Sequence, residues 1–257
     1  MCATCGCGPD SHQHEHHDHS HDHSSKGRIV TVEKDILHEN NLLAERNRGY
    51  FEGRNILAIN LVSSPGSGKT TLLEKTLTDL KDTLKFAVIE GDQQTTNDAD
   101  RIHATGTKVT QINTGKGCHL DAHMVLHAVQ GIKPEPDSVL FIENVGNLVC
   151  PAMFDLGEKE RVVVISVTEG DDKPLKYPDM FQSSTLCVIN KTDLLPYVNF
   201  NVEKAKEYAR RVNPTIDIIE VSCTSGNGLV TWYQWLCAKA FIGDRFGATE
   251  PALQEQA

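Results

Sequence analysis

Short apolar runs alternate with longer segments of helical periodicity along most of the chain. Apolar runs occur at Ile56–Val62, Phe86–Ile89, Val109–Ile112, Val139–Ile142, Val162–Val167, Leu186–Ile189 and Ile216–Val221. Continuous apolar strands separated by helices predict a mostly parallel sheet covered by helices on both faces. The fold class predicted is therefore α/β, and ligands of such a sheet bind at the carboxyl ends of its strands.

The two ends of the chain lack this pattern. Residues 1–27 are rich in cysteine and histidine without apolar periodicity, which predicts a flexible metal-binding tail. Residues 28–54 are expected to form a linker and an amphipathic helix, the helix over Glu33–Arg54. The main domain is then expected at 55–245, followed by a C-terminal tail at 246–257.

Composition narrows the classes of protein. The 257 residues are 39% hydrophobic, which is enough for one sizeable core. No run reaches the eighteen or so apolar residues of a membrane helix, so we expect no membrane insertion and a cytoplasmic location. A net charge of −10 argues against nucleic acid as a partner. The clustering of the eight cysteines favours metal binding over disulfides.

The segment Ser63–Thr71, SSPGSGKTT, follows the first apolar run and precedes a helical pattern. A strand, a glycine-rich turn and a Lys-Thr pair opening a helix are typical of a P-loop, although Ser63 stands where the pattern has glycine. In a P-loop the backbone N–H groups surround the phosphates, the lysine reaches the β and γ oxygens, and the hydroxyl holds Mg²⁺. The predicted nucleotide-binding residues are Gly66, Ser67, Gly68, Lys69, Thr70 and Thr71.

Two later loops specify the base. Asn190-Lys191-Thr192-Asp193 follows a predicted strand, where the base-recognition loop of a GTPase belongs. The carboxylate of Asp193 can accept from the N1–H and the exocyclic amine of guanine, a pair that adenine does not offer. Ser222 and Cys223, after the next strand, correspond to the second base-contacting loop. The nucleotide is predicted to be GTP or GDP.

Two acidic segments are expected as loops after strands, directed at the γ-phosphate. They supply Asp92 and Glu143, and Gly146 would let the backbone close on the phosphate. Each carboxylate can hold Mg²⁺ or its waters, or position the attacking water. The sequence does not divide these roles, so Lys69, Asp92 and Glu143 are all candidate catalytic residues.

Cys2, Cys5 and Cys7 place three thiols within six residues of the N-terminal tail. With the α-amine of the chain as a candidate fourth ligand, three sulfurs and one nitrogen suit Ni²⁺ in a square-planar site or Zn²⁺ in a tetrahedral one. A redox CxxC is the weaker interpretation, because no strand–helix pattern surrounds the cysteines to lower a thiol pKa. The histidines that follow, between His12 and His23, add weak imidazole ligands and suggest metal storage or buffering.

A second metal site is proposed from Cys118, His119 and Cys150, close to the acidic segments. From spacing alone, a buried structural cysteine is as good an interpretation as a ligand, because free cysteine packs as a small hydrophobe. The stretch 114–121 is expected to open a helix, on which His123 and His127 would continue the face of His119. The last two are interpreted as an ordinary helix face.

The combination of CATCGCG, SSPGSGKTTLLE, EGDQQT, TGKGCHLDAHMV, IENVGNLVCP, VTEGDDKPLKYP and NKTDLLPY resembles the hydrogenase nickel-incorporation GTPases of the HypB/UreG family. The resemblance runs from Cys2 to about Phe241. It implies a tight nickel site at Cys2, Cys5 and Cys7, and a weaker nickel or zinc site at Cys118, His119 and Cys150. It also implies a GTP-dependent homodimer, in which Lys173 and Lys176 are candidates to contact nucleotide across the interface. A solvated loop is an equal interpretation of these two lysines.

The resemblance further implies a function: a GTPase that couples GTP hydrolysis to nickel insertion into the large-subunit precursor of a [NiFe]-hydrogenase, together with a HypA-type accessory protein. Two alternatives stay open. One is a nickel-storage protein with a regulatory GTPase domain, favoured by the histidine-rich tail. The other is a urease-type nickel accessory GTPase, against which the cysteine-rich start argues.

Overall fold

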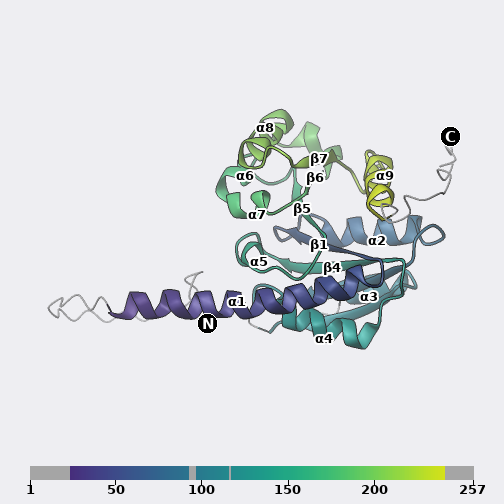
Figure 1. The fold of residues 1–257 in the computed structure, drawn as a ribbon. Helices are drawn as coiled ribbons and strands as arrows, with labels where there is room; N and C mark the ends of the chain where they lie inside the picture. The colour runs from purple at the N-terminus through teal and green to yellow at the C-terminus, as the bar shows by residue number, and fades with distance from the viewer. Residues whose placement is uncertain (1–23, 93–96, 116, 241–257) are drawn as a thin grey trace.

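A computed structural model describes residues 24–92, 97–115 and 117–240, with side chains from Lys34 onward. Within these residues, seven parallel strands form one twisted sheet (Figure 1). The strands are β1 Ile56–Ser63, β2 Phe86–Asp92, β3 Lys108–Asn113, β4 Ser138–Gly146, β5 Glu160–Ser166, β6 Leu186–Asn190 and β7 Asp217–Glu220.

The strand order, β3-β2-β4-β1-β5-β6-β7, puts β1 at the centre of the sheet. The chain builds one half with β2, β3 and β4, then crosses β1 to build the other half with β5, β6 and β7. Because the order reverses beside β1, its carboxyl end lies at the point where open α/β sheets bind ligands. This is the end from which the segment Ser63–Thr71 leaves.

Helices cover both faces of the sheet (Figure 1). One apolar cluster joins β1 and β2 to α2, α3 and α9, and two others join the opposite face to α1 and α4 and to α7 and α8. Trp232 of α9 anchors the first cluster, and its indole N–H donates to Thr76 of α2 at 2.8 Å. The helices are α1 Ser24–Glu52, α2 Lys69–Asp79, α3 Asn97–Ala104, α4 Ala122–Ile132, α5 Cys150–Met153, α6 Lys173–Lys176, α7 Pro178–Gln182, α8 Val202–Val212 and α9 Leu229–Ala240, with a 3-10 turn, η1, at Thr192–Tyr197.

The α/β fold class and the predicted strands are confirmed, but two acidic segments differ from the prediction. Glu90 to Asp92 and Glu143 to Gly146 belong to the strands β2 and β4 rather than to loops after them. These polar residues still pair with the neighbouring strands. Asp92 of β2 lies opposite Asn113 of β3, and Glu90 of β2 lies opposite Glu143 of β4. The sheet therefore sets where the backbone of these acids lies, since each of them belongs to a paired strand.

The helix boundaries also differ from the prediction. Helix α1 begins at Ser24, inside the residues assigned to the tail, and α4 begins only at Ala122. Asp121 caps α4, because its carboxylate accepts from the backbone N–H of Met124 at 2.7 Å. The expectation that His119 shares a helical face with His123 and His127 is therefore wrong, since His119 lies in the loop before the cap. In the described ranges, no helix combines the length and apolar character needed to cross a bilayer.

Candidate functional site

The P-loop joins the central strand β1 to helix α2. Its turn depends on Gly66 and Gly68, whose φ angles of +73° and +89° favour glycine. Gly68 has a second reason to lack a side chain, because a Cβ there would lie 2.5 Å from Nδ2 of Asn190. Glycine thus provides both the left-handed backbone and the close approach of the loop that begins at Asn190.

Lys69, Thr70 and Glu143 form a compact polar group where α2 begins. The Lys69 ammonium lies 3.0 Å from Oε1 of Glu143, and the Thr70 hydroxyl donates to the same oxygen at 2.5 Å. The side chains of Lys69 and Glu143 are only 11% and 1% exposed. Removing one member would leave the other as an unpaired buried charge, which is costly. Three of the residues predicted to act on phosphate and Mg²⁺ therefore lie together.

Buried polar atoms in and beside this group have no hydrogen-bond partner among the described residues. They include Oε2 of Glu143 and Oγ of Ser67. Buried polar atoms are normally hydrogen-bonded, so each is suited to a ligand. A carboxylate oxygen beside a threonine hydroxyl fits the oxygen ligands of Mg²⁺, and a P-loop hydroxyl fits phosphate.

Glu90 is a functional candidate that the sequence analysis missed. It is buried, and its neighbour across the β2–β4 pairing is Glu143. Burial, followed by the nearby charges of Glu143 and Asp92, raises the pKa of Glu90 to about 8. Alternation along β2 was the available signal, because it puts Glu90 on the same face as Asp92. Asp92 itself is half-buried at the end of β2.

The two predicted base-recognition loops pack onto the P-loop and onto each other. Asn190 donates to the carbonyl of Ser67 at 3.0 Å, and Lys191 donates to the carbonyl of Gly66 at 2.7 Å. The Ser222 hydroxyl donates to Oδ1 of Asp193 at 2.6 Å.

Cys223 also belongs to this group of loops, and its thiol contacts Oδ1 of Asn190 at 3.6 Å. Burial raises the pKa of the Cys223 thiol to about 11. The base loops and the P-loop are therefore one connected unit.

The remaining predicted residues of the nucleotide site contact the P-loop or its surroundings. A Cβ on Gly146 would lie 3.2 Å from Cα of Pro65, so the end of β4 approaches the P-loop closely. Thr71 is exposed, and its hydroxyl accepts from Arg101 of α3 at 3.1 Å.

The two lysines of the DKPLKYP stretch have different partners. Lys173 donates to the hydroxyl of Ser64 in its own P-loop at 3.2 Å and pairs with Glu169 at 3.0 Å. Lys176 pairs with Asp172 at 2.8 Å on the surface, which is the solvated arrangement. Lys173 therefore lies beside the P-loop of its own chain.

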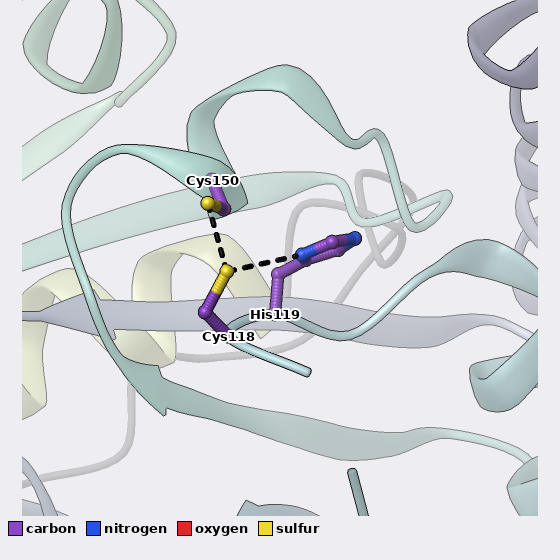
Figure 2. Close-up of side chains that lie close together, drawn as sticks. All are labelled: Cys118, His119 and Cys150. Atoms are coloured by element: carbon purple, nitrogen blue, oxygen red, sulfur yellow. Dashed lines mark hydrogen bonds between the residues drawn. The ribbon is translucent and has the colours of Figure 1, made fainter. Parts of the chain in front are cut away.

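Cys118, His119 and Cys150 come together although 32 residues separate the two cysteines (Figure 2). The two sulfurs are 2.8 Å apart, and Nδ1 of His119 lies 3.8 Å from the Cys118 sulfur. His119 stacks on Phe154 with ring centroids 4.0 Å apart, and burial lowers the pKa of the imidazole. Two thiols and a neutral imidazole are the ligand types that Ni²⁺ and Zn²⁺ accept.

Side chains from the end of β4 and from the residues just after it hold the loop that carries Cys118 and His119. The backbone N–H of Leu120 donates to Oδ1 of Asn144 at 3.2 Å, and Asn147 donates to the carbonyl of Cys118 at 3.2 Å. Leu120 also fits against Gly91, where a Cβ would lie 2.9 Å from its side chain. Glu143 of the nucleotide site and Asn144 of the loop anchor are adjacent residues. The two sites therefore share one strand.

Cys2, Cys5 and Cys7 lie outside the described residues, as does the histidine-rich tract, so the predicted tail site stays a prediction. The structure brings most of the other predicted residues into two groups, one around the P-loop and one around Cys118.

Comparison with known proteins agrees with this arrangement. The family described as CobW/HypB/UreG, nucleotide-binding domain, matches residues 57–220. The hydrogenase maturation factor HypB of Escherichia coli (strain K12) is 62% identical over 212 residues, which cover 82% of this chain and 73% of that protein.

Two solved structures have the same fold. The hydrogenase maturation factor HypB of Archaeoglobus fulgidus has a TM-score of 0.74 at 42% identity, covering 79% of this chain and 98% of that one. HypB of Helicobacter pylori in complex with nickel has a TM-score of 0.76 at 39% identity, covering 83% of this chain and 99% of that one. The chain is thus similar over most of its length to proteins named for hydrogenase maturation.

Proposed function

The chain belongs to the CobW/HypB/UreG family of nucleotide-binding proteins, and from this premise we propose that it is a GTP-hydrolysing nickel metallochaperone of [NiFe]-hydrogenase maturation. GTP binding and hydrolysis would control how tightly the chain holds nickel. The observation that carries the proposal is the shared strand β4, in which Glu143 contacts the P-loop and Asn144 anchors the Cys118 loop.

The nucleotide chemistry follows from the P-loop group. Lys69 and the P-loop backbone would bind the phosphates, and Asp193 would select guanine. Thr70 and Glu143 would hold Mg²⁺, with Asp92 as a further carboxylate for the ion or its waters. When bound, Mg²⁺ neutralises charge on the phosphates, and the remaining catalysis is positioning. The proposed reaction yields GDP and phosphate.

The metal chemistry follows from the Cys118 cluster. Its thiols and the His119 imidazole would take Ni²⁺ as cargo, and Zn²⁺ is a competitor for the same ligands. The Helicobacter pylori relative, described in complex with nickel, supports nickel as the ion. Cys2, Cys5 and Cys7 are proposed as a second, tighter nickel site.

Coupling between the sites would run through β4. When Mg²⁺ and phosphate bind, Glu143 has to exchange its contacts with Lys69 and Thr70 for new ones. A shift of Glu143 would move Asn144, the next residue. Because Asn144 accepts from the backbone N–H of Leu120, the loop before α4 would move with it. Linkage is reciprocal, so nickel must then alter nucleotide affinity by the same factor.

A GTP-dependent homodimer is proposed to complete the metal site. Val149 and Met153, on either side of the Cys150 turn, are 46% and 37% exposed. Apolar side chains exposed next to a metal ligand are suited to an interface. The proposed recipient is the large-subunit precursor of a [NiFe]-hydrogenase, with a HypA-type accessory protein as a further partner.

The proposal is tested by titrating Ni²⁺ into the full chain carrying Cys2, Cys5 and Cys7→Ala, with GDP or with a non-hydrolysable GTP analogue. The thiolate-to-nickel charge-transfer band reports only cysteine-bound metal, so the histidine-rich tract does not contribute. We expect the band, and we expect its titration midpoint to differ between the two nucleotides. Cys118→Ser with Cys150→Ser should abolish the band, whereas Cys237→Ser, a half-buried cysteine of α9, should leave it intact.

A midpoint that is the same with both nucleotides would overturn the coupling. If GTP is also not hydrolysed, with or without nickel, storage becomes the better function. A band that survives the double serine substitution would refute the assignment of the metal ligands.

A further inference from the structure

Two histidines on the surface of α4 form a pair that the proposed function does not use. His123 and His127 are exposed and lie one helical turn apart, where side chains share a face. Their Nε2 atoms are 3.0 Å apart, and the ring centroids are 4.4 Å apart at an interplanar angle of 81°. Both rings therefore turn the same nitrogen toward one point.

We propose that His123 and His127 form a metal site of their own, which binds Ni²⁺ or Cu²⁺ through the two Nε2 atoms, with water as the remaining ligands. The site stands whether or not the chain hydrolyses GTP. It is separate from the Cys118 cluster, because His119 lies before the Asp121 cap and is associated with Cys118 and Phe154.

The distance between the nitrogens favours this class of ion. With metal–nitrogen bonds of about 2.0–2.1 Å, nitrogens 3.0 Å apart subtend an angle of about 95° at the metal. This is close to the right angle between neighbouring ligands in square-planar or octahedral coordination. It is narrower than the tetrahedral angle that Zn²⁺ prefers.

Binding requires a change of tautomer in one ring and a small rotation of both exposed rings that turns their Nε2 lone pairs toward the metal. In the metal-free pair, one ring carries its proton on Nε2 and donates it to Nε2 of the other ring. With metal bound, both Nε2 atoms present lone pairs, so the donating ring carries its proton on Nδ1 instead. No charge is left buried, because both rings are exposed to water.

The site is tested on the full chain by measuring how fast each histidine reacts with diethyl pyrocarbonate, using tandem mass spectrometry of peptides. This readout resolves single residues, so metal held elsewhere in the chain does not obscure it. We expect Ni²⁺ to slow the modification of His123 and His127 together, at the same metal concentration. His103, an exposed histidine of α3, serves as the control and should react at an unchanged rate.

Two variants decide between the alternatives. His127→Gln, a surface change, should abolish the protection of His123, because a single imidazole lacks the second ligand. Cys118→Ser with Cys150→Ser should leave the protection of both histidines intact. The proposal is overturned if Ni²⁺ does not protect the pair, if His123 stays protected in His127→Gln, or if protection is lost in the double serine variant.

Discussion

The P-loop group and the Cys118 cluster lie at the same edge of the sheet, yet they are built differently. At the P-loop, a buried lysine and a buried carboxylate neutralise each other, with Lys69 and Glu143 3.0 Å apart. At the Cys118 cluster, two thiols and an imidazole lie together, and burial favours the neutral imidazole. The first group holds opposite charges before any ligand arrives, while the second gathers soft ligands.

This difference predicts how each site responds to substitution. A charge pair fails when one partner is lost, because the other is left buried and unpaired. A cluster of metal ligands keeps its ligands when a residue around it is substituted, but it loses affinity as its geometry relaxes. Variants of the first site should therefore have large effects on chemistry, and variants around the second should have graded effects on metal affinity.

The largest effect is expected for Glu143→Gln. The amide keeps the shape of the side chain but removes the charge that pairs with Lys69 and that suits Mg²⁺. We expect the rate of GTP hydrolysis under saturating GTP to fall by about 100-fold or more, as for removal of a group that stabilises transition-state charge. Single-turnover kinetics measure this directly.

The control for this variant is Glu135→Gln, which removes an exposed carboxylate that pairs only with surface lysines. It should hydrolyse GTP at the wild-type rate. A Glu143→Gln protein with unchanged hydrolysis would show that the carboxylate serves only the fold.

Asn144→Ala tests the connection between the two sites. It removes the acceptor for the backbone N–H of Leu120 and the bond from Asn144 to Asn60 at 3.3 Å. Leaving a buried donor unpaired costs about 1–3 kcal/mol of unfolding free energy. We expect the ratio of nickel affinities with GDP and with a GTP analogue, typically about 5- to 150-fold for coupled sites, to shrink toward one.

Loss of stability alone has to be separated from loss of coupling. Asn213→Ala is the matched control, because Asn213 donates to backbone carbonyls near α7, including that of Ser184 at 2.9 Å. It should lose comparable stability while the two nickel affinities keep their ratio. If Asn144→Ala keeps the ratio as well, β4 does not connect the sites.

The two sites also differ in how far the sequence predicted them. The P-loop could be predicted because its chemistry depends on consecutive residues, including Gly66 and Gly68, whose positive φ angles the pattern requires. The strands could be predicted because burial on both faces leaves continuous apolar runs. Their ends could not, since β2 and β4 extend through acids that interrupt the apolar signal.

For the Cys118 cluster, spacing allowed two interpretations, metal ligands or buried structural cysteine. It could not decide between them, because these residues come together only in the tertiary fold. Glu90 was missed for a related reason: its pKa is raised by burial in the sheet and then by Glu143, which belongs to a different part of the chain. The convergence of His123 and His127 depends on side-chain rotamers, which periodicity does not specify. Contacts between distant residues therefore account for most of what the sequence left open.

The raised pKa of Glu90 predicts that the free energy of unfolding depends on pH, and that this dependence comes from the P-loop group rather than from the Cys118 cluster. A carboxyl whose pKa rises from about 4.5 to about 8 on folding binds a proton more tightly in the folded state. Stability then falls as pH rises between these values, since ionisation becomes unfavourable in the folded protein. For the protein free of metal and nucleotide, we expect the unfolding free energy to decrease from pH 5 to pH 8.

Glu90→Gln should flatten this decrease, because the amide does not ionise. Chemical denaturation at a series of pH values measures the slope. Glu203→Gln, which alters an exposed acid of α8, should keep the wild-type slope. An unchanged slope in Glu90→Gln would assign the pH dependence to other groups.

The smallest effect is expected for Asp121→Ala, which removes the cap of α4 beside the Cys118 cluster. Asn201 caps α8 in the same way, accepting from Lys204 at 2.9 Å, as Asp121 does from Met124 at 2.7 Å. Loss of either cap costs about 1 kcal/mol of stability. Only Asp121 lies two residues from His119, so only its loss should let the ligand loop relax. We expect Asp121→Ala to weaken nickel binding at the thiolate band by a few fold and Asn201→Ala to leave it unchanged. Equal nickel affinities in the two variants would mean that the loop keeps its geometry through Asn144 and Asn147 alone.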